Sequence, residues 1–380
     1  MRRFEADRMV LRVSDSGLLG IMVLLTGTGV SALFSASYHF GRVAAGDPFY
    51  FFNRQILWIV LGTLFSFILS RMPLTLIRRL THPFIITTIV LNILTYVPGI
   101  GSTAGGASRW IEIGGNSFQP SELVRVALVL YMAHILDKKK DRMDDFLNSI
   151  LPVLIMSVFM TVLVYFQNDF SSAIYVFLIA ILLLFLAGIR WSYIFGGSAA
   201  IVLSAIPMVM AKPYRLERIR SWLSPLADPS GAGYQLLKSR MALQNGHFWG
   251  LGVGQGQVKL GGLPAAHSDF VFAVVGEETG FAGIVFILFL FLVFAIKGYS
   301  VALNSSSCYV RLAAFGLTSS VYFQVLINAA VVCGALPATG IPLPLFSAGG
   351  TSTLVTLGIF GLLINFSRYK AKDREVLCYG

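Results

Sequence analysis

The sequence predicts an all-α polytopic membrane protein with about ten transmembrane helices and one long extracytoplasmic loop that carries interfacial helices. Two observations of composition indicate this class: 56% of the 380 residues are hydrophobic and only 12% are charged, whereas soluble domains carry about a quarter charged residues. A third is a series of apolar runs that approach the length needed to cross a bilayer. The runs are 17–37, 54–71, 83–100, 120–136, 148–166, 171–188, 193–211, 270–296, 312–334 and 353–367.

The distribution of charge predicts how these spans are oriented. The net charge is +11, and most basic residues lie in alternate loops and in the tails 1–16 and 368–380. By the positive-inside rule both tails are cytoplasmic, and the whole chain, 1–380, forms a single membrane domain. Such a distribution favours anionic lipid over nucleic acid as the partner of the positive charge. Cys308, Cys333 and Cys378 are scattered, so neither a disulfide framework nor a zinc site is predicted.

The first polar cluster on the predicted outer side runs from 105 to 125. Pro120 suits the first turn of the fourth helix. Backbone N–H groups there have no hydrogen-bond partner within the helix, so a proline, which lacks an N–H, costs no hydrogen bond. Glu122 and Arg125 are three residues apart and share a helix face, so they can pair. Two interpretations stay open: an internal ion pair that locks helices together, or a phosphate site at Arg125 or Arg109, because a guanidinium group matches phosphate oxygens.

Asp169 lies between the fifth and sixth predicted spans, and we expect it to cap the sixth helix.

The long loop 212–267 carries further basic residues, which long translocated loops tolerate. Leu216, Ile219 and Trp222 recur at helical spacing beside three arginines, which predicts an amphipathic helix in the membrane interface. A second helical stretch is expected at 233–245. Glycines then crowd 250–256, but the segment lacks the Gly-Lys-Ser/Thr ending of a phosphate-binding loop, so we expect a hinge or re-entrant segment.

Three acids occur within ten residues where this loop enters the eighth span. Ionised side chains inside a membrane are energetically unfavourable, so the presence of Asp269, Glu277 and Glu278 at this position indicates either pairing with other groups or a functional role. Asp269 either caps the helix or works on a substrate at the membrane surface, and the two glutamates either pair with buried bases or contribute to a site. His267 is a hydrogen-bonding spacer or a weaker catalytic candidate. The segment 334–352, rich in proline and glycine, is expected to form a rigid wall of the outward-facing site.

Several of these stretches together resemble the SEDS family (shape, elongation, division and sporulation), whose members polymerise peptidoglycan from lipid II. The division members (FtsW-like) are favoured over the elongation members (RodA-like). Departures from the family pattern include Asn168, Arg125, Lys238 and Ala265, where proline, lysine, glutamine and an acid are usual. The stretches that carry the resemblance are 107–110, 119–122, 233–235, 267–270, 276–278 and 337–344.

The resemblance implies a glycosyltransferase in the bacterial inner membrane, acting at the division septum. Asp269 matches the family's essential aspartate and is the expected general base, with inversion at the sugar's anomeric carbon. A divalent cation, Mg²⁺ or Mn²⁺, is expected to assist, and no organic cofactor is expected. The expected partners are lipid II, undecaprenyl-pyrophosphate-linked glycan, a class B penicillin-binding protein, other cell-division proteins and membrane lipids. Candidate substrate-binding residues, including the basic groups for the leaving pyrophosphate, are Arg109, Glu122, Arg125, Arg215, Arg218, Lys238, Arg240, Lys259, His267 and Glu277.

Two other functions fit the same sequence features. A flippase or transporter for a lipid-linked precursor would also use about ten helices and intramembrane charges. A scaffold would activate a partner transpeptidase through the outer loop. Glycan synthesis in detergent, with and without that partner, separates these functions.

Overall fold

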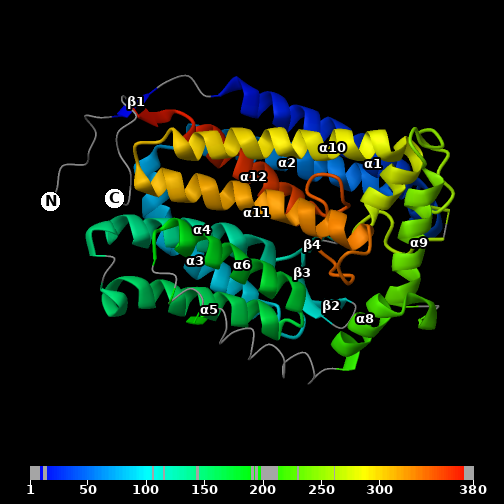
Figure 1. The fold of residues 1–380 in the computed structure, drawn as a ribbon, viewed down its shortest axis with the longest axis horizontal. Coiled ribbons are helices and arrows are strands. Elements are labelled where there is room, and N and C mark those ends of the chain that lie inside the picture. Colours follow the sequence, from blue (N-terminus) through cyan, green and yellow to red (C-terminus); the bar gives the residue numbers. More distant parts are fainter. Residues whose placement is uncertain are drawn as a thin grey trace.

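A bundle of long apolar helices makes up most of the computed structural model, which describes residues 9–11, 15–104, 107–113, 116–142, 145–189, 192, 196–197, 213–228, 231–260 and 262–371. The long helices run roughly alongside one another in Figure 1. They are α1 (Ser16–Ala45), α2 (Tyr50–Arg71), α3 (Leu74–Leu94), α4 (Ser121–Lys138), α5 (Leu151–Phe166), α6 (Phe170–Leu186), α10 (Val271–Leu303), α11 (Cys308–Val332) and α12 (Gly350–Phe366).

Shorter elements lie at the two ends of this bundle (Figure 1). The helical ones are η2 (Lys140–Arg142), η3 (Phe146–Ile150), α8 (Pro213–Leu223), η4 (Pro225–Ala227) and α9 (Ala232–Asn245). The strands are β1 (Met9–Leu11), β2 (Gly101–Ala104), β3 (Ala107–Ile113), β4 (Asn116–Phe118) and β5 (Tyr369–Ala371). The strands β2, β3 and β4 form an antiparallel sheet, with Ser102 opposite Trp110 and Glu112 opposite Ser117.

The helices confirm the predicted polytopic class. Each predicted span corresponds to a helix except 193–211, which lies largely outside the described residues. Among the described residues, six helices are long and apolar enough to cross a membrane. The helices α6 and α12 are apolar but slightly shorter, and α4 carries four charged residues, including the pair Glu122 and Arg125.

The predicted start of the third span was wrong. The sequence placed it at 83–100, but α3 runs from Leu74 to Leu94 and has Pro83 inside it. Arg78, taken as a loop residue, lies on the helix and pairs with Asp137 of α4 at 2.9 Å. Because this ion pair neutralises Arg78, the helix can include that residue. Pro83 is tolerated as well, since a proline can lie within a membrane helix when neighbouring groups bond to the backbone carbonyl that it leaves unpaired.

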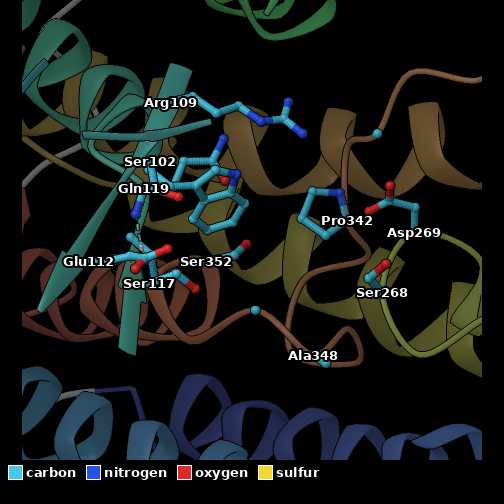
Figure 2. Close-up of a pocket in the computed structure, with 14 residues that line it drawn as sticks. Ser102, Arg109, Glu112, Ser117, Gln119, Ser268, Asp269, Pro342, Ala348 and Ser352 are labelled. Atoms are coloured by element: carbon cyan, nitrogen blue, oxygen red, sulfur yellow. Dashed lines mark hydrogen bonds between the residues drawn. The ribbon is translucent and has the colours of Figure 1, made fainter. Parts of the chain in front are cut away.

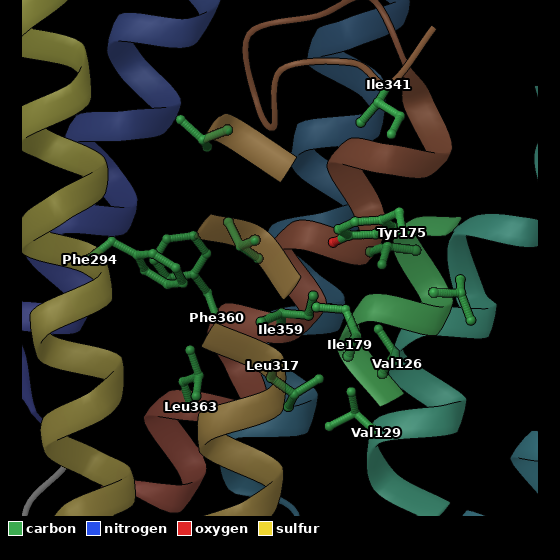
Figure 3. Close-up of a cluster of buried hydrophobic side chains, with 14 of the residues drawn as sticks. Val126, Val129, Tyr175, Ile179, Phe294, Leu317, Ile341, Ile359, Phe360 and Leu363 are labelled. Atoms are coloured by element: carbon green, nitrogen blue, oxygen red, sulfur yellow. The ribbon is translucent and has the colours of Figure 1, made fainter. Parts of the chain in front are cut away.

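The core forms around α11 and α12, between α4 and α6 on one side and α10 on the other. Figure 3 shows Leu317 of α11 and Phe360 of α12 among the buried side chains, with Val129 of α4 and Phe294 of α10 on either side. The rings of Phe294 and Phe360 lie 4.7 Å apart between centroids. This packing fixes where α10, α11 and α12 end, and therefore where the loops at their ends meet.

The helix α10 is broken at Gly280, whose φ of 67° and ψ of −167° are not helical. The break frees backbone groups that must be paired in an apolar environment. Four hydrogen bonds between α10 and the segment 247–252 replace the lost helical hydrogen bonds. They are Leu251 N to Glu277 O (3.0 Å), Gly252 N to Glu278 O (3.0 Å), Phe281 N to His247 O (3.0 Å) and Ala282 N to Phe248 O (3.1 Å).

Both helices predicted in the long loop are present, as α8 and α9. The helix α9 is fastened to the end of α11, since Ser239 Oγ donates to Val332 O (3.0 Å) and Arg240 Nη2 donates to Gly334 O (3.0 Å). In α8, Arg215 is buried and Leu223 is exposed, and the predicted placement of this helix in the membrane interface stays a prediction.

Candidate functional site

A cavity of about 450 Å³ lies where the loops at one end of the bundle meet. Its walls come from three parts of the chain (Figure 2): the sheet β2–β4, residues 268–269 just before α10, and the segment that runs from Gly340 into the first turn of α12. The segment 334–352 was predicted to form a wall of the site. Pro342, Ala348 and Gly349 of this segment line the cavity, so the prediction is confirmed for these residues.

The sheet supplies a polar wall because its side chains alternate. Trp110 and Glu112 of β3 line the cavity, as do Ser102 of β2 and Ser117 of β4. Between the first two, Ile111 is buried against the protein. Successive side chains on a strand point to opposite faces, which places Trp110 and Glu112 on the face toward the cavity and Ile111 on the buried face. Arg109, from the other face, reaches the cavity as well.

The backbone around Asp269 is held by groups distant in the sequence. Asn328 Nδ2 of α11 donates to the carbonyl oxygen of Asp269 and to that of Ile341, both at 2.9 Å. The amide of Ala348 donates to the carbonyl oxygen of His267 at 2.8 Å. These bonds join the Asp269 turn, α11 and the proline-rich wall into one fixed unit.

The Asp269 side chain lines the cavity and does not cap α10. Phe270 is the residue before that helix, and no side chain caps it. Burial raises the pKa of the Asp269 carboxyl above its ordinary value, while Arg109 and Arg218 lower it and Asp169 adds a smaller upward effect. A carboxyl group with a raised pKa is a stronger base than an ordinary aspartate.

His267, the neighbouring candidate, does not line the cavity. Its ring lies between those of Phe40 and Phe51, with centroids 4.9 and 4.5 Å away. Burial lowers the pKa of this imidazole, which keeps it neutral. Its Nδ1 atom has no hydrogen-bond partner within the part of the chain that the structure describes.

Two arginines border the carboxylate but have other contacts as well. Arg109 of β3 lines the cavity and pairs with Asp169 at 2.9 Å. The other carboxylate oxygen of Asp169 accepts from the amide of Ser172 at 3.1 Å, which confirms the predicted cap of α6. Arg218 of α8 donates to the carbonyl oxygen of Ala338 at 3.1 Å.

The structure places the predicted pair Glu122 and Arg125 in contact, at 2.9 Å, but not on the cavity. Arg125 is buried in α4, where it also bonds to Gln324 and to the hydroxyl of Tyr175. Of the two interpretations that the sequence left open, this geometry favours the internal ion pair over the phosphate site at Arg125.

Two further basic candidates also bind within the protein. Arg215 is buried, donates to the hydroxyl of Tyr165 at 2.7 Å and lies 4.5 Å from the centre of that ring. Lys238 lies over the ring of Tyr234 at 5.4 Å. Neither residue lines the cavity.

Lys259 and the two glutamates of α10 fasten the long loop to the bundle. Lys259 Nζ lies 2.5 Å from Glu278 and donates to Ser35 Oγ of α1 at 2.8 Å. Glu277 accepts a hydrogen bond from the amide of Val258 at 3.0 Å. The interpretation that buried bases neutralise these acids therefore fits Glu278, whereas Glu277 is satisfied by a backbone amide.

Residues that the sequence did not single out complete the cavity. Trp110, Glu112, Ser117, Gln119 and Ser352 line it. For Trp110 and Glu112 the available signal was the enrichment of 107–113 in aromatic and β-branched residues, which is typical of a strand. No such signal marks Ser117, Gln119 or Ser352.

No group of three or more histidine, cysteine or acidic side chains that could hold a metal ion occurs among the described residues. Two carboxylates, Glu112 and Asp269, line the cavity. Mg²⁺ commonly uses one or two protein carboxylates and completes its shell with water and substrate phosphates. The residues present therefore fit a cation that a phosphate-bearing substrate brings with it.

Comparisons with known proteins give consistent results over nearly the whole chain. The family model of cell cycle proteins that groups FtsW, RodA and SpoVE matches residues 16–372. A probable peptidoglycan glycosyltransferase FtsW from Geobacter sp. (strain M18) is 38% identical over 368 residues, covering 97% of this chain and 98% of that protein.

Two solved structures share the fold. A chain from a peptidoglycan synthase complex, described for its coordination of polymerization and crosslinking, superposes with a TM-score of 0.77 at 28% identity and covers 93% of this chain and 98% of its own length. The rod shape determining protein RodA of Thermus thermophilus gives a TM-score of 0.69 at 26% identity, covering 95% of this chain and 98% of that one.

Proposed function

This chain belongs to the cell cycle protein family of FtsW, RodA and SpoVE, and from that membership and the cavity at Asp269 we propose that it is a membrane-embedded peptidoglycan glycosyltransferase that polymerises lipid II. The observation that carries the proposal is the half-buried carboxylate of Asp269, held by its backbone at the edge of a cavity at the end of a bundle of membrane helices, where desolvation raises its pKa. The similarity to proteins named as such glycosyltransferases supports it.

Asp269 is the general base in this proposal. It accepts the proton of the 4-hydroxyl group of a GlcNAc residue as that oxygen attacks the anomeric carbon of a MurNAc residue. The bond from that carbon to the oxygen of undecaprenyl pyrophosphate breaks, and the diphosphate leaves with the electron pair. A single displacement converts the α-linked donor into a β-linked product, so the reaction inverts the anomeric centre without a covalent enzyme intermediate.

The two arginines near Asp269 would keep it ionised between turnovers. Arg109 and Arg218 lower the pKa that burial raises, and so favour the ionised carboxylate that a general base requires. A divalent cation, Mg²⁺ or Mn²⁺, would be held by Glu112 together with the substrate's phosphates. When bound, it would supply positive charge for the departing diphosphate.

A membrane location follows from the substrate's structure. The polyprenyl chain can stay among lipids while its sugars reach a cavity at the end of the helices. We further propose that the cavity faces away from the cytoplasm, that both termini are cytoplasmic and that the protein acts at the division septum with a class B penicillin-binding protein. The similarity to a chain of a peptidoglycan synthase complex supports a transpeptidase partner.

The deciding experiment assays the purified full chain on lipid II, with and without that transpeptidase. Asp269→Asn is expected to lose at least about a hundredfold in glycan synthesis, the usual contribution of a positioned base. The variant should stay folded, because it replaces the carboxyl group of Asp269 with a neutral group of the same shape.

The matched control is Asp47→Asn, which changes an exposed carboxylate after α1 that accepts from the amide of Phe49 at 2.9 Å. An amide oxygen keeps that bond, so activity should be unchanged. Near-normal synthesis by folded Asp269→Asn would remove Asp269 from the role of base. Absence of synthesis by the unaltered chain with its transpeptidase partner would overturn the proposed activity.

A further inference from the structure

The first turn of α12 opens onto the same cavity as Asp269. Gly349 precedes the helix and no side chain caps it, while Gly349, Thr351 and Ser352 all line the cavity. Thr353 is the first residue of the helix whose amide donates to a backbone carbonyl, that of Gly349 at 2.9 Å. The three amides before it have no partner among the described residues. The positive end of a 17-residue helix is therefore directed at the cavity without a neutralising group.

A buried hydroxyl group at this turn is also unpartnered. Ser352 is only 6% exposed, and its Oγ atom has no hydrogen-bond partner in the part of the chain that the structure describes. Leaving a buried hydroxyl unsatisfied is unfavourable. Since the side chain lines the cavity, a ligand in the cavity is the available partner (Figure 2).

The turn is held firmly by its surroundings. The amide of Gln119 donates to Thr351 Oγ1 at 3.0 Å, and Gln55 Nε2 of α2 donates to Thr353 Oγ1 at 2.7 Å. The backbone at Gly350 packs so closely on Trp58 that a Cβ atom there would lie 2.1 Å from the indole nitrogen. Donors fixed in this way need little reorganisation when an anion binds.

Backbone amides contribute positive potential at this wall of the cavity. Among the described residues that line the cavity, Arg109 is the one basic side chain, and it pairs with Asp169. Unpaired amides in the first turn of a helix are an arrangement that binds phosphate groups.

We propose that the first turn of α12, from Gly349 to Ser352, is the subsite for the diphosphate of the lipid-linked donor. This inference rests on the proposed function. The amides of Gly350, Thr351 and Ser352 and the hydroxyl of Ser352 donate to the diphosphate oxygens. As the sugar–oxygen bond breaks, these donors stabilise the negative charge on the departing diphosphate.

The position of the turn suits a displacement with inversion. The attacking oxygen and the leaving group lie on opposite sides of the anomeric carbon, so the base and the diphosphate site must be on different walls. In Figure 2, Asp269 and Ser352 lie well apart, on different elements, with Pro342 between them in the view. A sugar placed between the two meets both requirements.

The test measures binding of inorganic pyrophosphate to the full chain by calorimetry, in neutral lipid nanodiscs, alongside glycan synthesis from lipid II. Ser352→Asp places a negative charge at the helix N-terminus, where it favours the helix but repels a bound anion. We expect it to weaken pyrophosphate binding about tenfold or more. Ser352→Ala, which removes only the hydroxyl group, is expected to weaken binding about two- to tenfold, and it replaces the aspartate variant if that protein does not fold.

The matched control is Ser224→Asp, which adds the same charge to an exposed residue just before η4 that does not line the cavity. It should change pyrophosphate binding less than about threefold. Equal losses in both aspartate variants, or no loss in either Ser352 variant, would overturn the proposal.

A second arm separates the diphosphate from a phospholipid headgroup. Nanodiscs that contain phosphatidylglycerol should not displace pyrophosphate from the unaltered chain, and displacement would assign the turn to a headgroup instead. Failure of the proposed function is distinguishable, because pyrophosphate binding with the expected Ser352 dependence can persist in a chain that makes no glycan.

Discussion

The protonation state of Asp269 depends on opposing neighbours. Burial raises the pKa of this carboxyl group, and Arg109 contributes the largest downward influence among the charges around it. A base works only when deprotonated, so glycan synthesis should fall as the pH drops through the raised pKa. We therefore expect the acid limb of the rate profile at a pH above the ordinary aspartate value of about 4.

Replacing Arg109 tests that electrostatic argument. Arg109→Gln removes a positive charge that favours the carboxylate, so the pKa of Asp269 rises further and the acid limb should move to higher pH. Arg220→Gln, an exposed change on α8, should leave the limb in place. Initial rates on lipid II between about pH 4 and 9 measure both. An unmoved limb in Arg109→Gln would mean that another group sets the profile.

Lys259 and Glu278 form a buried ion pair whose loss should be severe. Their side chains are 8% and 5% exposed. Removing one partner leaves an unpaired buried charge, so Lys259→Met should destabilise the protein by about 3–5 kcal/mol. The double variant Lys259→Met with Glu278→Met should recover most of that loss. Thermal unfolding in detergent measures the effect, and no recovery in the double variant would contradict the assignment.

An exposed ion pair is the natural comparison for this one. Lys297 and Asp15 lie 3.6 Å apart with side chains 41% and 22% exposed. Because solvent screens them, Lys297→Met should change stability by less than about 1 kcal/mol.

Residue pairs were predictable from the sequence only when they were local. The contact of Glu122 with Arg125 follows from three-residue spacing, and the cap at Asp169 follows from its place before a helix. The partners of Asp269 do not follow from any spacing, because Asn328 and Ala348 reach it or its neighbour from distant segments. The charge of Lys259 was visible, but its burial against Glu278 depends on how the long loop folds back.

At the scale of elements, helices were easier to predict than strands. A run of apolar residues long enough to cross a bilayer has few alternatives to a helix, because every backbone group must be paired within it. The sheet β2–β4 has short strands of mixed polarity. The sheet forms because these three segments pair with one another, and Trp110 and Glu112 then face a cavity. Neither feature can be inferred from the sequence of one segment alone.

The break in α10 leads to a prediction about backbone geometry. Gly280 has a φ of 67°, and a Cβ atom there would lie 2.4 Å from the amide nitrogen of Gly250. Gly280→Ala should therefore separate the segment 247–252 from α10 and destabilise the protein by at least about 1–3 kcal/mol. The control Gly27→Ala lies in α1 with open space around it. Thermal unfolding should show it unchanged or slightly more stable, and an equally tolerated Gly280→Ala would show that the break is not required.

Across the whole molecule, the segments predicted to be cytoplasmic gather at one end. The strand β1 pairs with β5, and β1 lies at the end of the bundle opposite α8 and α9 in Figure 1. Lys297 meets Asp15 there, and Arg78 of α3 bonds to Ser307 at 3.0 Å. Asp269 lies with the loops of the opposite end. This arrangement agrees with an even number of crossings, although span 193–211 lies largely outside the described residues.

The membrane side of each end is testable by labelling introduced cysteines in intact cells. In a chain whose three native cysteines are replaced by serine, Leu226→Cys is expected to react with a membrane-impermeant thiol reagent. Leu226 is 84% exposed in the turn η4, within the long loop. Asp141→Cys, exposed in η2 after α4, should react only after the cells are opened. The opposite pattern would place the Asp269 cavity in the cytoplasm, where an enzyme could not build strands that are assembled outside the membrane, and the proposed function would then be wrong.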